Sequence, residues 1–126
     1  LPLMKILIAD DEAHIRMLIE QTLDDLEDEG VEILTAANGE EALEGILDER
    51  PELVFVDVMM PKMDGMEVCR QVKSKLGEAS PYLVMLTAKG QDLDKQKGME
   101  AGADLFLTKP FDPDEIQSIA LRVLGL

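Results

Sequence analysis

The sequence predicts an α/β fold with a parallel β-sheet, on the strength of two observations. Short apolar segments alternate five times with longer amphipathic segments, which is the pattern of repeated strand–helix units. Several of the apolar segments contain almost no polar residue, as expected of parallel strands that helices cover on both faces. Right-handed connections leave few topologies for such a chain. The expected strands are residues 4–9, 31–36, 52–57, 81–87 and 103–108.

The expected strands differ in how continuous their apolar runs are. The runs within 4–9, 52–57 and 81–87 are almost wholly apolar, as in strands buried on both faces. The segment 31–36 mixes polar and apolar residues, and we expect it at an edge of the sheet.

Helices are expected between the strands because apolar residues recur there at helical spacing. The first helix carries such a stripe and ends at Gly30. Three later helices begin at residues that cap helices well, Asn38, Asp64 and Asp112, and Pro113 stands at the first position of the last one. A glutamate follows each cap three residues later, at Glu41, Glu67 and Glu115. The stripe of the first helix consists of Ile15, Leu18, Ile19, Thr22, Leu23 and Leu26.

The segment 90–101 is a weaker helix. Its apolar residues are few, namely Leu93, Met99 and Ala101, and Gly98 lies inside it. A helix with so few anchoring side chains is expected to be among the less stable elements of the fold. This segment is therefore a candidate for the part of the molecule that moves.

The composition is that of one folded domain spanning residues 1–126. The chain has 126 residues, 46% of them hydrophobic, which suits a single core. Residues 1–3 precede Met4 and are interpreted as an added or trimmed end. No apolar stretch approaches the roughly 20 residues needed to span a bilayer. The single cysteine, Cys69, excludes an intrachain disulfide and favours a cytoplasmic protein.

The net charge limits the partners that this chain can bind. Lys and Arg number 12 against 27 Asp and Glu, which gives a formal charge of −15. Such a charge opposes direct binding to nucleic acid and adsorption to anionic membranes. We therefore expect neither partner.

Chemically useful side chains follow four of the expected strands. The carboxyl ends of parallel strands meet at one edge of the sheet, where ligands bind in open α/β folds. We therefore expect these side chains to converge. They are Asp10 and Asp11 after the first strand, Asp57 after the third, Thr87 and Ala88 after the fourth, and Lys109 and Pro110 after the fifth.

The convergent groups have complementary roles in phosphoryl transfer. Three carboxylates so close together repel one another unless a cation intervenes, and Mg²⁺ prefers carboxylate oxygens and binds alongside phosphate. The Asp57 carboxylate could attack a phosphoryl group to form an acyl phosphate. The Lys109 ammonium and the Thr87 hydroxyl could then stabilise charge on the phosphoryl oxygens, and the small Ala88 leaves room for them.

Taken in order, these residues resemble those of a response-regulator receiver domain of two-component signalling, over essentially the whole chain. The residues that carry the resemblance are Asp10-Asp11, Asp57, Met60-Pro61-Lys62-Met63-Asp64-Gly65, Thr87-Ala88, Gly102-Ala103-Asp104 and Lys109-Pro110-Phe111. The resemblance implies a flavodoxin-like fold with strand order 2-1-3-4-5 and helices on both faces. It also implies that Asp57 accepts a phosphoryl group from a histidine kinase or a phosphotransfer protein. Such a domain is a switch and not an enzyme, apart from the phosphoryl transfer and dephosphorylation that it catalyses on itself.

The resemblance also implies how the metal is held. Asp11 and Asp57 would bind Mg²⁺ directly, Asp10 would bind it mainly through water, and the Met59 backbone carbonyl would complete the protein ligands, with Mn²⁺ as an alternative ion. The peptide bond between Lys109 and Pro110 is expected to be cis, an isomer that few X-Pro bonds adopt.

A switch follows from the same resemblance. In receivers the hydroxyl residue, here Thr87, moves toward the phosphoryl group and an aromatic side chain on the fifth strand, here Phe106, turns inward behind it. The readout surface would be formed by residues near 90–101, 104–108 and 112–124, facing an unidentified output domain or protein. Asp104 matches part of the acidic pair through which some receivers dimerise, whereas Leu105 replaces the second acid. The chain is therefore expected to be a monomer or a phosphorylation-dependent dimer.

Three other functions compete with that of a receiver. An FMN-binding carrier is disfavoured because the turn after the first strand is acidic, where phosphate binding needs glycines and N–H groups. An aspartyl-phosphate hydrolase would carry a second acid two residues after Asp57, where this chain has Met59. A receiver kept only as an interaction module is disfavoured because every expected site residue is present.

Met59 and Lys89 flank the expected path of the attacking water, and the apolar Met59 predicts slow loss of the phosphoryl group.

Overall fold

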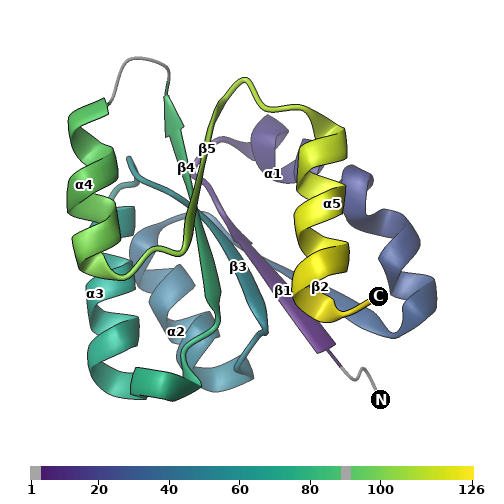
Figure 1. Ribbon diagram of the computed structural model, residues 1–126, viewed down its shortest axis with the longest axis horizontal. Helices are drawn as coiled ribbons and strands as arrows, with labels where there is room; N and C mark the ends of the chain where they lie inside the picture. The colour runs from purple at the N-terminus through teal and green to yellow at the C-terminus, as the bar shows by residue number, and fades with distance from the viewer. Residues whose placement is uncertain (1–3, 89–91) are drawn as a thin grey trace.

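One sheet of five parallel strands, in the order β2-β1-β3-β4-β5, forms the centre of the molecule (Figure 1). The structure is a computed structural model that describes residues 4–88 and 92–126, with side chains except at 92–95. This strand order confirms the flavodoxin-like topology. The strands are β1 (Met4–Ala9), β2 (Val31–Ala36), β3 (Leu53–Asp57), β4 (Tyr82–Ala88) and β5 (Leu105–Lys109).

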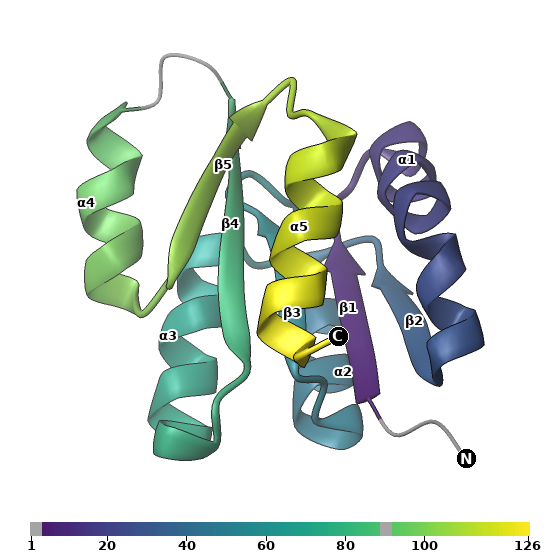
Figure 2. The same ribbon diagram turned by 45° about the vertical axis from the view of Figure 1, so that its right-hand side comes forward.

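Helices cover both faces of the sheet. Helices α1 and α5 lie on one face, and α2, α3 and α4 lie on the other (Figures 1 and 2). Within the described part of the chain, no helix is long and apolar enough to cross a membrane. The helices are α1 (Ala13–Leu23), α2 (Gly39–Glu49), α3 (Gly65–Leu76), α4 (Asp92–Ala101) and α5 (Pro113–Leu124), with short 3₁₀ helices at η1 (Asp24–Glu29) and η2 (Gly77–Ala79).

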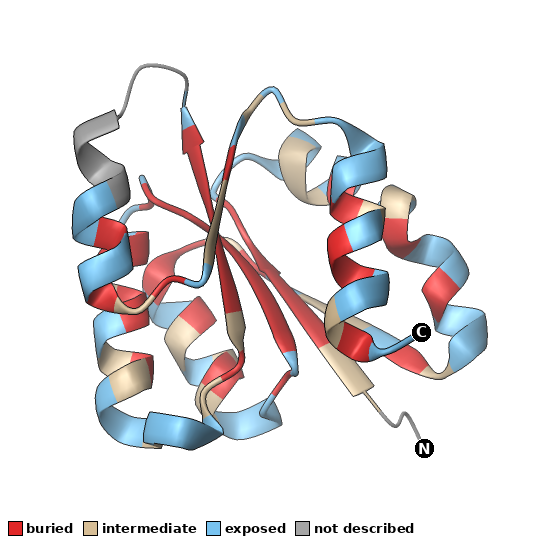
Figure 3. Ribbon diagram, viewed as in Figure 1, coloured by how far each residue is buried: buried red, intermediate tan, exposed pale blue. Residues whose placement is uncertain are grey.

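Two apolar cores result from the alternation of side chains along the strands. In β3, Val54 and Val56 face the core under α2 and α3, whereas Leu53 and Phe55 face the core under α1 and α5. Every residue of β3 is buried (Figure 3). Strand β2 is an edge strand with exposed and half-buried residues, as its mixed sequence predicts. The carboxyl ends of all five strands point to one edge of the sheet (Figure 2).

Side-chain caps determine where several helices begin. The Asn38 side chain accepts a hydrogen bond from the Glu41 N–H at 3.0 Å, as the capping pattern predicts. The Glu41 carboxylate accepts from the Asn38 side-chain amide and from the Ala37 N–H. The Asp64 carboxylate likewise accepts from the Glu67 N–H. The last cap differs from the prediction in detail, because the Asp112 carboxylate accepts from the N–H two residues on, at Asp114.

The first and last strand–helix units deviate from the predicted boundaries for local reasons. Helix α1 stops at Leu23, and Leu26 is buried from the 3₁₀ turn η1, which ends at Gly30 with a left-handed φ of 85°. Strand β5 begins at Leu105, two residues later than predicted. At this end Asp104 pairs with Leu83 partly through its side chain, since its carboxylate accepts the Leu83 N–H at 2.8 Å.

Candidate active site at the carboxyl edge of the sheet

The sheet brings three of the predicted strand-end residues into direct contact. Strand β1 pairs with β3, and β4 lies between β3 and β5, so Asp10, Asp57 and Lys109 come from elements that share one edge. The Lys109 ammonium lies 2.9 Å from Asp10 Oδ2 and 3.2 Å from Asp57 Oδ2. A third carboxylate, that of Glu12, lies 4.0 Å from the same ammonium. One lysine therefore bridges acids from two strand ends, and it lies 99 positions from Asp10 and 52 from Asp57 in the sequence.

Both bridged carboxylates are buried. Asp10 is 0% exposed and Asp57 is 5% exposed. Removing two negative charges from water is costly unless a counter-charge and hydrogen bonds replace the solvent. Lys109 supplies the counter-charge, and backbone N–H groups supply hydrogen bonds at 2.9 Å from Glu12 to Asp10 Oδ1 and 3.3 Å from Met59 to Asp57 Oδ1.

Burial and charge repulsion together perturb the titration of Asp57. Burial, and then the neighbouring charge of Asp10, raise the pKa of Asp57 to about 6, although Lys109 and the Met59 N–H act in the opposite direction. Burial opposes the charge of Lys109, but its hydrogen bonds and the negative charges of Asp10 and Asp57 raise the pKa of its ammonium. At neutral pH the site therefore holds a charged lysine beside a carboxylate that is poorly neutralised and gains from additional positive charge.

A cluster of acidic oxygens suits a divalent cation. One carboxylate oxygen from each of Asp10, Asp11 and Glu12 lies within 4.8 Å of the others, which is the kind of donor set that Mg²⁺ prefers. The raised pKa of Asp57 also fits a nearby cation, because a positive charge favours the ionised carboxylate. The structure connects Asp57 to this group through Lys109. The predicted ligand set contained Asp57 and the Met59 carbonyl and did not contain Glu12.

Sequence reasoning missed Glu12 and Arg16. Glu12 directly follows the acidic pair, and its place beside Asp11 was the available signal. The Arg16 guanidinium donates a hydrogen bond to the Asp10 backbone carbonyl at 2.7 Å. No sequence pattern indicates a hydrogen bond of this kind, because it joins a side chain to a main-chain atom across a turn.

The residues predicted to contact the phosphoryl group end β4, at the same edge of the sheet. Thr87 is 2% exposed, and its hydroxyl donates a long hydrogen bond of 3.5 Å to the Leu107 carbonyl of β5. Ala88 ends β4 in register with Lys109, and the Lys109–Pro110 peptide bond is cis, the isomer that the resemblance implies. Lys89, predicted to flank the water path, lies outside the described residues.

Phe106 packs against a helix that has room for it only because of a glycine. Its side chain is half-buried and contacts the core under α3 and α4. A Cβ placed on Gly98 of α4 would lie 2.7 Å from Phe106 Cε1 and 3.3 Å from Met85 Sδ. The ring therefore fills space that any other residue at position 98 would occupy.

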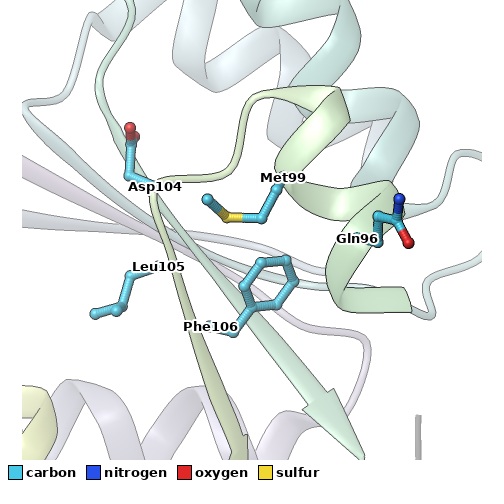
Figure 4. Close-up of a pocket in the computed structure, with 5 residues that line it drawn as sticks. All are labelled: Gln96, Met99, Asp104, Leu105 and Phe106. Atoms are coloured by element: carbon cyan, nitrogen blue, oxygen red, sulfur yellow. The ribbon is translucent and has the colours of Figure 1, made fainter. Parts of the chain in front are cut away.

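An apolar groove runs between α4 and β5 beside this ring. Its volume is about 540 Å³. Figure 4 shows Gln96 and Met99 reaching it from α4 and Phe106 from β5. Among the described side chains, Asp104 and Leu105 also line it. The Asp104 carboxylate is already bonded to the Leu83 N–H, so this acid has a structural role within the chain.

Comparison with known proteins identifies the family. The family model named response regulator receiver domain matches residues 6–121 of this chain. The chain belongs to the response regulator receiver domain family. It is thus a receiver domain of the kind that response regulators of two-component systems carry, and the resemblance seen in the sequence is confirmed.

Individual relatives agree with this assignment. The chain is 42% identical over 120 residues to the alkaline phosphatase synthesis transcriptional regulatory protein PhoP of Bacillus subtilis (strain 168), covering 95% of this chain and 48% of PhoP. The REC domain of AraT, a response regulator from Geobacillus stearothermophilus, superposes with a TM-score of 0.85 at 33% identity, covering 98% and 94% of the two chains. Chemotaxis response regulator CheY4 of Vibrio cholerae superposes with a TM-score of 0.81 at 35% identity, covering 95% of this chain and 98% of CheY4. The receiver spans about half the length of the curated relatives it matches.

Asp57→Asn is expected to stabilise the metal-free protein near neutral pH. The pKa of Asp57 in the fold, about 6, lies above its ordinary value of 3.8. The group therefore stabilises the fold at low pH, and this stability is lost as the pH rises through about 6. This difference corresponds to about 3 kcal/mol and already includes the attraction of Lys109. An amide does not fully reproduce the protonated carboxyl group, so a gain of about 1–2 kcal/mol is expected at pH values above about 7.

Urea unfolding of parent and variant at about pH 7.5 and about pH 5 measures this effect. The gain should shrink at the lower pH. Asp48→Asn, at an exposed position of α2, is the matched control and should show no such trend. A variant that is less stable than the parent at the higher pH would contradict the prediction.

Gly98→Ala is expected to destabilise the protein by about 1–2 kcal/mol, because the added methyl group meets the Phe106 ring. In an unobstructed helix the same change would stabilise by up to about 1 kcal/mol, so the two expectations differ in sign. Urea unfolding of both single variants and of Gly98→Ala combined with Phe106→Leu gives the coupling between the sites. The smaller leucine should remove most of the cost of the alanine. If Gly98→Ala stabilises the protein with Phe106 in place, the packing of the Phe106 ring does not depend on this glycine.

Proposed function

We propose that this chain is a phosphorylatable receiver that accepts a phosphoryl group on Asp57 from a histidine kinase or a phosphotransfer protein and acts as a single domain. The observation that carries the proposal is the buried Asp57 carboxylate beside the Lys109 ammonium at 3.2 Å, next to an acidic cluster suited to Mg²⁺. Family membership supports the same chemistry. Asp10, Asp11, Asp57 and the Met59 carbonyl would hold the ion, and Glu12 is a further candidate.

The transfer needs an ionised carboxylate. An Asp57 oxygen attacks the phosphorus of the donor phosphohistidine, the new O–P bond forms, and the P–N bond breaks with its electron pair going to the imidazole nitrogen. With a pKa of about 6, Asp57 is mostly ionised at neutral pH and is more basic than an ordinary aspartate. Lys109 neutralises charge on the transferred group. Bound Mg²⁺ would supply further positive charge to the phosphoryl oxygens.

The proposed readout runs through Thr87 and Phe106. The Thr87 hydroxyl, which in this structure donates to the Leu107 carbonyl, would turn to a phosphoryl oxygen. That movement would release the β5 backbone near Phe106 and change the face formed by α4, β5 and α5. The groove beside Phe106 supports this face as the readout surface. PhoP is named a transcriptional regulatory protein and is about twice as long, which supports an output domain or separate protein as the recipient.

The oligomeric state proposed for the receiver is a monomer or a dimer that forms on phosphorylation. Leu105 stands where some receivers carry a second acid, and the Asp104 carboxylate is bonded to Leu83. Both observations weaken a charged contact on this face. Direct binding to nucleic acid is not proposed, since the chain carries a charge of −15.

Labelling with acetyl phosphate tests the proposed function. The parent protein with Mg²⁺ should gain one phosphoryl group, measured by intact mass, whereas Asp57→Asn should gain none and removal of Mg²⁺ by a chelator should prevent labelling. Asp48→Asn keeps the site intact and should label as the parent does. Equal labelling of Asp57→Asn and parent would overturn the assignment, and sustained turnover of a phosphomonoester would indicate a hydrolase instead.

Met59→Asn is expected to shorten the lifetime of the phosphorylated protein several-fold. The Met59 side chain is 63% exposed beside the acceptor, and an apolar thioether cannot orient an attacking water as an amide can. Decay of the acyl phosphate after removal of the donor measures the lifetime. Met17→Asn, at a methionine of similar exposure on α1, is the matched control. Equal decay in parent and Met59→Asn would show that this position does not set the lifetime.

A further inference from the structure

We propose that Arg16 is a positioning residue that prepares the acidic loop between β1 and α1 for the metal ion, by holding the Asp10 backbone carbonyl. This inference rests on the proposed function, since it concerns the same cation site. It assigns a role to a residue that provides no metal ligand and does not touch the Asp57 acceptor in the contacts described above.

The geometry of the loop carries the proposal. The half-buried Arg16 side chain lies one turn into α1, and its Nη1 donates to the Asp10 carbonyl at 2.7 Å. The Arg16 N–H also donates to the Glu12 carbonyl at 3.2 Å, as part of the first turn of the helix. Side chains in a helix point toward its N-terminus, so the guanidinium reaches back over the loop that carries all three carboxylates of the cluster.

The start of α1 lacks the usual means of fixing such a loop. Its N-cap residue, Glu12, makes no side-chain cap hydrogen bond. The loop is instead held through Asp10, whose Oδ1 accepts from the Glu12 N–H at 2.9 Å and whose backbone N–H donates to the Ala36 carbonyl at 3.2 Å. Arg16 closes this set by taking the Asp10 carbonyl. Every hydrogen-bonding group of the Asp10 backbone therefore has a partner that fixes its orientation.

The choice of a carbonyl partner matters for the cation. The chain offers 27 acidic residues, yet among the described residues the Arg16 guanidinium forms no ion pair with a carboxylate within 4.0 Å. An arginine bonded to Asp11 or Glu12 would compete with a metal for their oxygens. Bonded to a main-chain oxygen, it orders the loop and does not itself occupy the carboxylate oxygens of Asp11 and Glu12. Pre-ordered ligands bind more tightly because less conformational freedom is lost on binding.

The effect of charge alone would have the opposite sign. A guanidinium near the acidic cluster repels a cation, so removing it should tighten metal binding if electrostatics were its only contribution. A positioning role predicts weaker binding. The direction of the change in affinity therefore separates the two roles.

Calorimetric titration of the metal-free, unphosphorylated protein with Mg²⁺ tests the proposal, at about 0.5 M salt to screen long-range charge. Arg16→Met is expected to bind Mg²⁺ about tenfold more weakly than the parent, and Arg16→Lys, which keeps a donor of similar reach, should recover part of the loss. Amide hydrogen exchange at Asp11 and Glu12 should be faster in Arg16→Met without metal. Arg70→Met, at an exposed arginine of α3 paired with Glu67, should bind Mg²⁺ as the parent does.

Unchanged or tighter binding in Arg16→Met would overturn the positioning role. If Arg16→Met does not fold, Arg16→Lys decides alone, and affinity below the parent's with faster exchange at Asp11 supports the proposal, whereas parental values for both overturn it. Failure of the proposed function is distinguishable, because the parent itself would then neither bind Mg²⁺ nor incorporate phosphoryl groups.

Discussion

The ammonium of Lys109 stabilises the buried carboxylates at the carboxyl edge of this sheet. A parallel sheet brings its strand ends together, and here that places two buried carboxylates close enough to share one cation. Without a counter-charge these anions would repel each other in a medium that screens charge poorly. The Lys109–Asp10 contact joins residues 99 positions apart. It therefore ties the last strand to the first while Asp57, between them, stays ionisable and only partly neutralised.

Stability and reactivity have the same origin at this edge. The burial that raises the pKa of Asp57 also limits the access of water to its carboxylate. Asp10, whose charge disfavours the ionised form of Asp57, belongs to an acidic cluster that suits a cation. The side of the sheet formed by α4 and β5 is less buried. Strand β5 is only partly buried, and the Phe106 ring rests on the bare backbone of Gly98 in the weakly amphipathic α4. Strand β5 thus joins the acidic edge, where Lys109 lies, to the partly buried surface where Phe106 lies.

Sequence patterns predicted those features that depend on periodicity or on strand ends. Apolar alternation located the five strands, cap residues located the starts of α2 and α3, and the convergence of Asp10, Asp57 and Lys109 followed from parallel topology. Features that depend on side-chain to backbone bonds were not predictable. The Arg16 bond to Asp10, the Asp104 bond that delays β5, and the two-residue Asp112 cap leave no periodic trace in the sequence. The position of Glu12 in the acidic cluster depends on the path of the loop, which the sequence pattern does not indicate.

The direction of the first strand and of the last helix has a practical consequence. Strand β1 begins, and α5 ends, at the end of the sheet opposite the acidic edge (Figure 2). A fluorescent label attached at the start of β1 or at the end of α5 would therefore lie at the far end of the sheet from Asp57. The strands and helices would separate such a label from the Asp57 carboxylate, and the acidic edge would stay uncovered.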